Sequence, residues 1–254
     1  MEIKGKKAVV FGGASGMGRA TAELLAARGA DVAVLDRPQS AGGEVAAALG
    51  GSFHPIDVTD FAATESALDA AVQALGGLHV SVTTAGGGSV RRTLGKDGPH
   101  DLETFRRVLD LNVVATFNIS RLAAALMSRN EPEEPDGERG VILNTSSIAA
   151  FEGQIGQVAY SAAKAAIAGM SLTMARDLGS LGIRVVAIAP SLFETGATEK
   201  IPAETRAALV KDAAFPRRPG RPEEYAKLAL AVVDNPMLNG QCLRLDAGQR
   251  FGPK

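Results

Sequence analysis

The stretch Ala-Val-Val-Phe-Gly-Gly-Ala-Ser-Gly-Met-Gly at residues 8–18 decides the fold. Its first four residues are apolar, which is typical of a buried strand. Three glycines then follow with the spacing G-x-x-x-G-x-G, at Gly12, Gly16 and Gly18. A helical pattern of apolar residues continues through Leu25. A strand, a tight glycine turn and a helix in this order are typical of an α/β unit in which the helix packs on a sheet.

Short apolar segments alternate with longer Ala/Leu-rich segments along the rest of the chain. We predict strands at 8–11, 31–36, 53–58, 78–83, 141–144, 183–189 and 241–245, and later helices at about 43–49, 60–75, 102–127 and 158–178. Strands that are apolar throughout and separated by helices imply a parallel sheet covered on both faces. Right-handed crossovers then lead to a single doubly wound α/β sheet, the Rossmann fold. We find no linker or repeat, so residues 1–254 are expected to form one domain.

Composition narrows the functional class. The chain has 254 residues, and its net charge of −1 gives no bulk attraction to nucleic acid or to an anionic membrane. The single Cys242 excludes an intramolecular disulfide, and the three histidines lie far apart, so no metal site is predicted. We find neither a targeting segment nor an apolar run long enough for a membrane span. A cytoplasmic protein is therefore expected.

The glycine turn is a candidate phosphate site. A helix that begins there presents unpaired N–H groups and its positive dipole end, and glycines let the backbone approach a pyrophosphate. Ser15 and Met17 lie inside this turn. An ordinary glycine turn is the alternative interpretation, but its position directly after the first strand favours a dinucleotide site.

Acidic residues at the ends of the next two strands extend this site. Asp36 follows Gly18 by 18 residues, where a carboxylate can accept hydrogen bonds from ribose hydroxyls and repel a 2′-phosphate, which favours NAD over NADP. Arg37 beside it is the residue that would instead accommodate a 2′-phosphate. Asp57 and Val58 are candidates to contact the adenine; for Asp57, a helix cap or turn is the alternative.

Tyr160 and Lys164 are the candidate catalytic pair. They lie four residues apart on a predicted helix and so share one face. A free tyrosine has a pKa of about 10, and a nearby ammonium or an oxidised nicotinamide favours the phenolate. We predict that Tyr160 gives a proton to a carbonyl in reduction and takes one from an alcohol in oxidation. By itself, Tyr-x-x-x-Lys occurs by chance on many helices.

Two further polar residues strengthen this hypothesis. Ser147 follows the fifth predicted strand, at the carboxyl edge where open α/β sheets bind ligands, and its hydroxyl can stabilise charge on a substrate oxygen. Asn112 lies within the long helix predicted at 102–127, where asparagine is unfavourable, so a polar role is indicated.

Together, the glycine turn, Asn112, Ser147, Tyr160 and Lys164 resemble the short-chain dehydrogenase/reductase family over the whole chain. The resemblance implies that Lys164 also binds the nicotinamide ribose and that Asn112 supports a water-linked proton relay. It also implies further cofactor contacts, at Ala85, Gly86, Pro190, Leu192 and Phe193.

Within the family, the chain looks most like the type II 3-hydroxyacyl-CoA dehydrogenases. The matching segments are 130–132, 151–157, 175–178, 188–193, 239–240 and 244–246, and members similarly carry an extra loop where residues 86–100 lie. This resemblance implies NAD-dependent oxidation of 3-hydroxyacyl-CoA thioesters in fatty acid metabolism, activity on some steroids and alcohols, and a homotetramer.

Three positions depart from the family pattern. Phe11 stands where threonine is usual, Thr83-Thr84 replaces Asn-Asn before Ala85-Gly86, and Ser191 replaces a glycine. The first two usually support each other by hydrogen bonding, so their joint change suggests one coupled rearrangement between the first and fourth strands. Ser191 is expected to stiffen its loop.

Two segments are candidates for substrate contact. The family resemblance places a substrate lid at 192–215, where Phe193, Leu209 and Phe215 line an acyl pocket or pack the lid's own core. Three basic residues of the 86–100 loop are candidates for the phosphates of coenzyme A, with a solvated basic loop as the alternative; they are Arg91, Arg92 and Lys96.

Other functions remain open at this point. A reductase of 3-oxoacyl carrier-protein thioesters is one, although Asp36 argues against its usual NADPH. A steroid or secondary-alcohol dehydrogenase on the same scaffold is another. A non-catalytic, cofactor-binding regulator is the third, and the presence of all four catalytic candidates argues against it.

Overall fold

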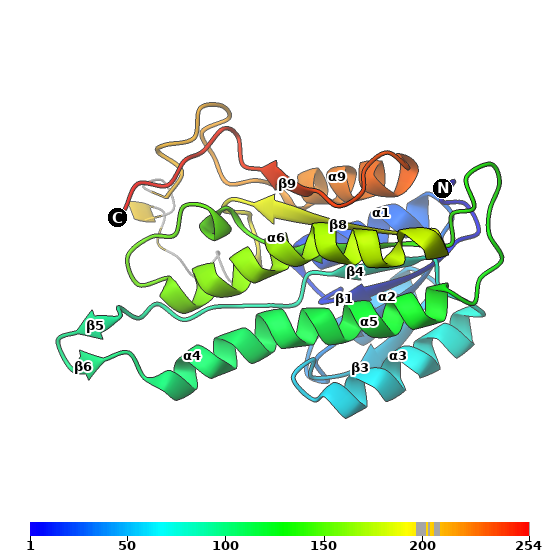
Figure 1. Ribbon diagram of the computed structural model, residues 1–254, viewed down its shortest axis with the longest axis horizontal. Coiled ribbons are helices and arrows are strands. Elements are labelled where there is room, and N and C mark those ends of the chain that lie inside the picture. The colour runs from blue at the N-terminus through cyan, green and yellow to red at the C-terminus, as the bar shows by residue number, and fades with distance from the viewer. Residues whose placement is uncertain (197–201, 203, 206–208, 254) are drawn as a thin grey trace.

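Seven parallel strands form one sheet in the computed structural model, which describes residues 1–196, 202, 204–205 and 209–253 (Figure 1). The strand order is β3-β2-β1-β4-β7-β8-β9, so the order reverses between β1 and β4. Their bounds are β1 Lys7–Phe11, β2 Asp31–Asp36, β3 Ser52–Pro55, β4 Val80–Thr83, β7 Gly140–Thr145, β8 Ile183–Pro190 and β9 Cys242–Leu245. The predicted doubly wound parallel sheet is confirmed.

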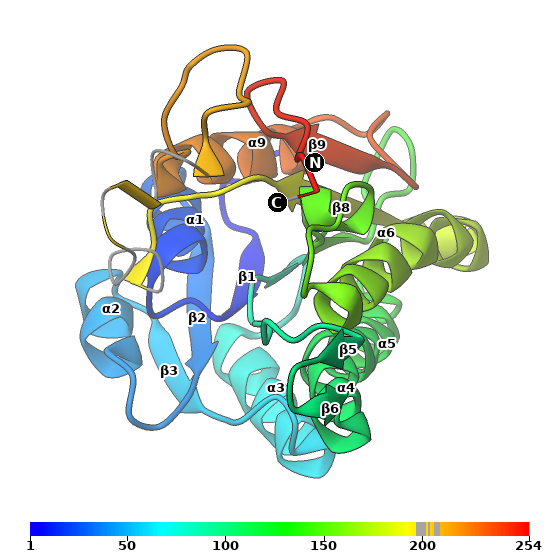
Figure 2. The same ribbon diagram turned by 90° about the vertical axis from the view of Figure 1, so that its left-hand side faces the viewer.

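Helices cover both faces of this sheet (Figure 2). One face carries α1 Gly16–Ala27, α2 Gly42–Ala48 and α9 Pro222–Asp234; the other carries α3 Phe61–Leu75, α5 Ala115–Met127 and α6 Val158–Leu178. Helix α4, Leu102–Leu109, packs against α6. Alternate residues of one strand enter opposite cores. In β1, Val10 packs with Leu25 of α1, whereas Phe11 packs with Leu68 of α3. Both strand faces are therefore buried, which explains the continuously apolar strands.

Helix α9 and a short hairpin are among the elements that were not predicted. Helix α9 begins at Pro222 with Glu223 and Glu224 in its first turn, a typical helix start that the sequence did contain. A short hairpin, β5 Leu94–Gly95 with β6 Gly98–Pro99, projects from the predicted 86–100 loop (Figure 1). The third strand is also shorter than predicted and ends at Pro55, although the Ile56 amide still donates to the Asp36 carbonyl of β2.

The long helix predicted at 102–127 is not one uninterrupted α-helix. A π-helical turn, Asp110–Val114, joins α4 to α5 and carries Asn112. Such turns are rare and are found frequently at functional sites. By length and composition, the combined helix Leu102–Met127 could cross a membrane, yet more than half of its most apolar stretch is buried within the fold.

The 130–140 segment, between α5 and β7, contributes a buried ion pair to the core. Glu138 is buried, and its carboxylate pairs with Arg184 of β8 at 2.7 Å. The Arg184 guanidinium also donates to the carbonyls of Val232, Val233 and Leu238. This segment therefore helps to fix α9 to the sheet through a buried ion pair, a long-range contact that composition alone does not reveal.

Candidate active site

The glycine turn lies between β1 and α1, at the carboxyl edge of the sheet where its strand order reverses. Gly12 has a left-handed backbone (φ 79°), and a Cβ on it would come within 2.7 Å of the Ala85 nitrogen. A Cβ on Gly18 would collide with the carbonyl oxygen of Gly12. The fold itself thus requires glycine at two of the three motif positions, whether or not a ligand binds at the turn.

The turn also meets the requirements for a phosphate. Ser15 is the N-cap of α1, but its exposed side chain makes no capping hydrogen bond, and Gly16, Met17 and Gly18 form the first helical turn. The N–H groups of this turn are therefore not capped by the Ser15 hydroxyl, and they coincide with the positive end of the helix dipole. This arrangement fits the pyrophosphate of a dinucleotide.

Asp36 lies beside this turn, as the sequence predicted. Its Oδ2 accepts a hydrogen bond from the Ala14 amide at 3.0 Å, and its Oδ1 accepts one from the Arg37 amide at 2.7 Å. The carboxylate is therefore held at the end of β2, next to the glycine turn, while Arg37 is exposed.

Asp57 and Val58 follow β3 in different environments. The exposed Asp57 accepts hydrogen bonds from the Thr59 amide (2.9 Å) and hydroxyl (2.7 Å), which lower the pKa of its carboxyl. Asp57 thus forms a turn, the alternative that the sequence had left open. Val58 is buried in the core with Phe11. A role for either residue at the adenine stays a prediction.

The changed pair at β1 and β4 does preserve a link between the strands. The Thr84 hydroxyl donates to the Phe11 carbonyl at 3.0 Å, and the amides of Thr84 and Ala85 donate to the same oxygen. Phe11 needs no hydroxyl because its ring is fully buried in the core. The hydrogen-bonding side chain therefore comes from Thr84, the residue that follows β4, and this hydrogen bond is the predicted rearrangement between the two strands.

Asn112 holds the chain that leaves β4. Its amide nitrogen donates to the carbonyls of Gly87 (2.7 Å) and Val108 (2.8 Å), and its oxygen accepts from the Gly87 amide (3.3 Å). Gly86, just before, faces both Asn112 and the Lys164 ammonium. Gly88, just after, packs against the Tyr160 ring. Asn112 therefore fixes the segment that covers the catalytic pair, and the proposed water relay remains a prediction.

Tyr160, Lys164 and Ser147 come together at the carboxyl edge of β7. The Lys164 nitrogen lies 5.6 Å from the centre of the Tyr160 ring. The Ser147 side chain is close enough to the Tyr160 hydroxyl to lower the pKa of the phenol. Ser147 also accepts a hydrogen bond from the Ala149 amide at 3.2 Å, as the N-cap of a 3-10 turn, Ile148–Ala150. Three of the four predicted catalytic residues thus form one cluster, and Asn112 adjoins it through Gly86.

Burial acts on both members of the pair. It raises the pKa of Tyr160, and the hydrogen bond from Ser147 opposes this rise. Burial also lowers the pKa of Lys164 to about 8. The direction for Tyr160 is opposite to the sequence-based expectation, because desolvation of the phenolate outweighs the effect of its neighbours. Tyr160 is therefore a protonated phenol at neutral pH, ready to donate to a carbonyl oxygen.

Lys164 is held in place by buried residues that the sequence analysis did not identify. The Lys164 ammonium donates to the Thr145 carbonyl at 2.9 Å. The Thr145 hydroxyl is 2.6 Å from the Thr83 carbonyl and 2.7 Å from the hydroxyl of Tyr225, a fully buried residue of α9. Tyr225 is one of only two tyrosines in the chain, but nothing in its local sequence connects it with Lys164.

The residues predicted to contact the cofactor after β8 differ in how deeply they are buried. Pro190 ends β8 and is buried, Leu192 is partly exposed, and the Ser191 amide donates to the Leu245 carbonyl of β9 at 3.1 Å. Phe193 is buried against Gly220, edge-on to the Tyr225 ring at 6.5 Å. Its side chain therefore packs in the core, and any cofactor contact at Phe193 remains a prediction.

The residues predicted for an acyl pocket do not share one environment. Phe193 is buried, Leu209 is partly buried, and Phe215 is 84% exposed. Part of the predicted lid, residues 197–201, 203 and 206–208, lies outside the described residues. Among the residues that are described, no group of three potential metal ligands occurs.

This arrangement can move a proton to or from a substrate oxygen. Ser147 and Tyr160 present adjacent hydroxyls, Lys164 supplies a buried cation, and the glycine turn fits a dinucleotide on the same edge of the sheet. An oxygen placed between the two hydroxyls would receive a hydrogen bond from Ser147 and a proton from Tyr160.

Comparisons with known proteins agree with this chemistry. The family model described as short chain dehydrogenase matches residues 6–206. The 3-hydroxyacyl-CoA dehydrogenase type-2 of Drosophila melanogaster is 49% identical over 99% of this chain and 100% of its own. The crystal structure of 3-hydroxyacyl-CoA dehydrogenase type-2 from Mycobacterium avium is 42% identical, with a TM-score of 0.94 over 98% of both chains. A 7α-hydroxysteroid dehydrogenase complexed with NADH and 7-oxo glycochenodeoxycholic acid is 31% identical, with a TM-score of 0.88 over 100% of this chain and 97% of its own.

Proposed function

The chain belongs to the short-chain dehydrogenase family, and on that basis we propose that it interconverts a 3-hydroxyacyl-CoA and the corresponding 3-oxoacyl-CoA with NAD. The observation that carries the proposal is the joint presence of the Ser147–Tyr160–Lys164 cluster and of near-half identity, over the whole chain, to an enzyme named for this activity. The substrate is proposed from that name; the oxidoreductase chemistry follows from the family.

In the proposed mechanism, the chain binds the substrate and moves its proton. Nicotinamide, when bound, supplies or accepts the hydride. Ser147 binds the 3-oxygen of the substrate and orients it toward Tyr160. Tyr160 donates its proton to that oxygen in reduction and accepts it back in oxidation. Lys164 would hold the nicotinamide ribose and, as a cation, favours the Tyr160 phenolate that forms in reduction. Asn112 keeps the segment at Gly86 and Gly88 in place over this pair.

We propose NAD rather than NADP because of Asp36. Its carboxylate is fixed beside the glycine turn by the Ala14 amide, where it would accept hydrogen bonds from the ribose hydroxyls and repel a 2′-phosphate. The exposed Arg37 next to it is the one neighbouring residue that would favour the phosphate.

The decisive experiment is steady-state oxidation of NADH, and of NADPH, with acetoacetyl-CoA as substrate. We expect turnover with NADH and a kcat/KM at least about tenfold lower with NADPH, which corresponds to about 1.4 kcal/mol of discrimination. A preference for NADPH would overturn the role of Asp36. Absence of turnover with both would remove the thioester assignment and leave a steroid or secondary alcohol as the alternative substrate within the family.

We propose that the basic loop residues Arg91 and Arg92 bind the phosphates of coenzyme A. Both lie beside the β5–β6 hairpin, are exposed, and precede the Lys96 of its turn. The double variant Arg91→Ala/Arg92→Ala should raise the KM for acetoacetyl-CoA by about tenfold and leave the KM for a small secondary alcohol unchanged, because only the thioester carries the phosphates. Equal changes in both KM values would instead identify a solvated loop.

We also propose that the chain forms a homotetramer. Val114 and Phe117, on the helix formed by the π-helical turn and α5, and Leu172 on α6 are exposed apolar residues. Helices α5 and α6 lie on the same face of the sheet (Figure 2), so both are available to pack against another copy. A solution mass of four chains by light scattering tests this assembly.

A further inference from the structure

We propose that Arg244 and Glu152 are positioning residues that orient the Ser147 hydroxyl toward Tyr160. The inference rests on the proposed function in that it takes Ser147 and Tyr160 as the catalytic hydroxyls. Neither Arg244 nor Glu152 lies in the cluster itself, and each acts through the chain that connects Ser147 with Tyr160.

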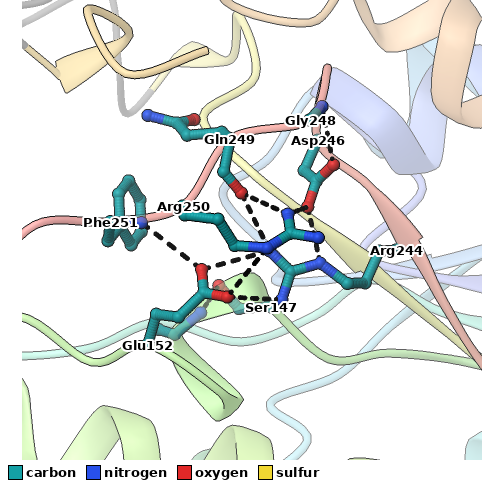
Figure 3. Close-up of polar contacts among 9 residues, drawn as sticks. Ser147, Glu152, Arg244, Asp246, Gly248, Gln249, Arg250 and Phe251 are labelled. Carbon is teal, nitrogen blue, oxygen red and sulfur yellow. Dashed lines mark hydrogen bonds and ion pairs between the residues drawn. The ribbon is translucent and has the colours of Figure 1, made fainter. Parts of the chain in front are cut away.

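The pair is held by a dense set of ionic contacts (Figure 3). Arg244 of β9 binds the Glu152 carboxylate with two nitrogens, at 2.9 and 3.1 Å. Its remaining nitrogen, Nε, donates to Asp246 at 2.6 Å. The guanidinium also lies over the Phe151 ring, 5.3 Å from its centre. Two-point contacts of this kind fix the carboxylate in direction as well as in distance.

Glu152 transmits this fixed position to Ser147 through a short chain of backbone hydrogen bonds. The Glu152 amide donates to the Ile148 carbonyl at 3.0 Å, and the Ala150 amide donates to the Ser147 carbonyl at 3.0 Å. Ser147 also caps this 3-10 turn through the Ala149 amide. Displacement of Glu152 therefore displaces the turn from which the Ser147 hydroxyl projects.

The C-terminal tail, residues 249–253, also binds the segment between Ser147 and Tyr160. The Phe251 amide donates to Glu152 at 3.3 Å, and the Ile155 amide donates to the Pro253 carbonyl at 3.1 Å. The Gln249 carbonyl accepts a hydrogen bond from Arg244 at 2.9 Å. The segment between Ser147 and Tyr160 thus rests on β9 and the tail, and Arg244 contacts all three (Figure 3). Arg250 of the tail adds weaker ion pairs, to Glu152 at 3.4 Å and to Asp246 at 3.1 Å.

The chain offers a direct probe of this positioning that requires no turnover. It contains no tryptophan and only two tyrosines. Burial raises the pKa of Tyr225 far above its ordinary value, so tyrosinate absorbance that develops first with rising pH reports Tyr160. The Ser147 hydrogen bond lowers the pKa of Tyr160. Lys164 lies beside the Tyr160 ring, but burial lowers its pKa to about 8, so its ammonium has lost its charge before Tyr160 titrates. A misplaced Ser147 therefore moves the Tyr160 midpoint upward.

The test is a near-ultraviolet pH titration of the full chain, four variants and one control variant. Ser147→Ala should raise the Tyr160 midpoint by about 0.5 to 1 in pH, the equivalent of one hydrogen bond. Arg244→Gln and Glu152→Gln should both raise it as well. The two substitutions remove opposite charges, so a simple electrostatic effect would move the midpoint in opposite directions. The double variant Ser147→Ala/Arg244→Gln should match Ser147→Ala alone.

Arg139→Gln is the matched control. Arg139 makes two hydrogen bonds to backbone carbonyls, those of Asn130 and Leu181, near the opposite end of β7. Its loss should lower the melting temperature without changing the Tyr160 midpoint. Should Arg244→Gln fail to fold, Glu152→Gln and Arg244→Lys provide the same measurement.

Two results would overturn the inference: a wild-type midpoint in folded Arg244→Gln or Glu152→Gln, or opposite shifts in these two variants. Failure of the substrate proposal would look different. In that case acetoacetyl-CoA is not turned over, while the midpoints still shift together.

Discussion

Replacement of Tyr160 by phenylalanine should lower kcat by about a thousandfold or more and leave the affinity for NADH almost unchanged. Tyr160 is the group that exchanges a proton with the substrate oxygen, and proton transfer from a positioned side chain contributes about 10² to 10⁴ to the rate. The Ser147 hydroxyl can still bind the substrate oxygen. It cannot replace Tyr160 in the proton transfer, because no proton acceptor lies beside Ser147 itself among the residues that the structure describes. Phenylalanine preserves the ring, and with it the packing of Gly88 against that ring.

Two measurements decide this prediction. Single-turnover oxidation of NADH with acetoacetyl-CoA gives the loss in the chemical step, and quenching of NADH fluorescence gives the affinity for the cofactor. Tyr160→Phe with kcat within tenfold of wild type would refute the acid/base role. A loss of NADH affinity equal to the loss in kcat would assign Tyr160 to cofactor binding instead.

The strands of this fold were predictable because each carries its own local pattern. All seven main strands lie within a few residues of their predicted positions, since a parallel sheet buried on both faces requires continuous apolar runs. The family was predictable for a similar reason: Tyr160, Lys164 and Ser147 lie close together in the sequence, and the family that this pattern resembles is confirmed by the comparisons.

What the sequence did not reveal depends on contacts between distant segments. The Tyr225 hydroxyl meets Thr145 across 80 residues, and Arg244 meets Glu152 across 92. Neither residue has a local motif that points to its partner. The π-helical turn at Asn112 differs from an α-helix only in that its backbone hydrogen bonds span one more residue. Over five residues this difference does not change the periodicity of apolar residues in the sequence.

The direction of the Tyr160 pKa shift has a similar origin. Sequence spacing shows that Lys164 is near Tyr160, but it does not show how deeply the two are buried or that the ammonium donates to the Thr145 carbonyl. Burial decides the outcome for both groups. The expected phenolate therefore depends on charge supplied with the cofactor, in addition to the charge of Lys164.

Replacement of Lys164 by methionine should reduce kcat/KM by about a hundredfold or more and, at pH 7, increase the free energy of unfolding. Burial lowers the pKa of Lys164 from 10.5 to about 8. Because the folded state holds this proton less tightly than the unfolded chain, the buried ammonium costs about 3 kcal/mol below pH 8. That cost decreases as the pH rises from 8 and is gone above about 10.5.

Methionine has a similar length but carries no charge, so the variant avoids this cost. It loses the hydrogen bond to the Thr145 carbonyl, worth about 1–2 kcal/mol. The variant should therefore be about 1–2 kcal/mol more stable than wild type at pH 7, with the difference reversed in sign at pH 10. Urea denaturation at the two pH values measures both differences. Lys227→Met, at an exposed position of α9, is the control and should show no such reversal. If Lys164→Met were less stable than wild type at both pH values, the fold would already compensate the buried charge, and Lys164 would contribute to stability as well as to catalysis.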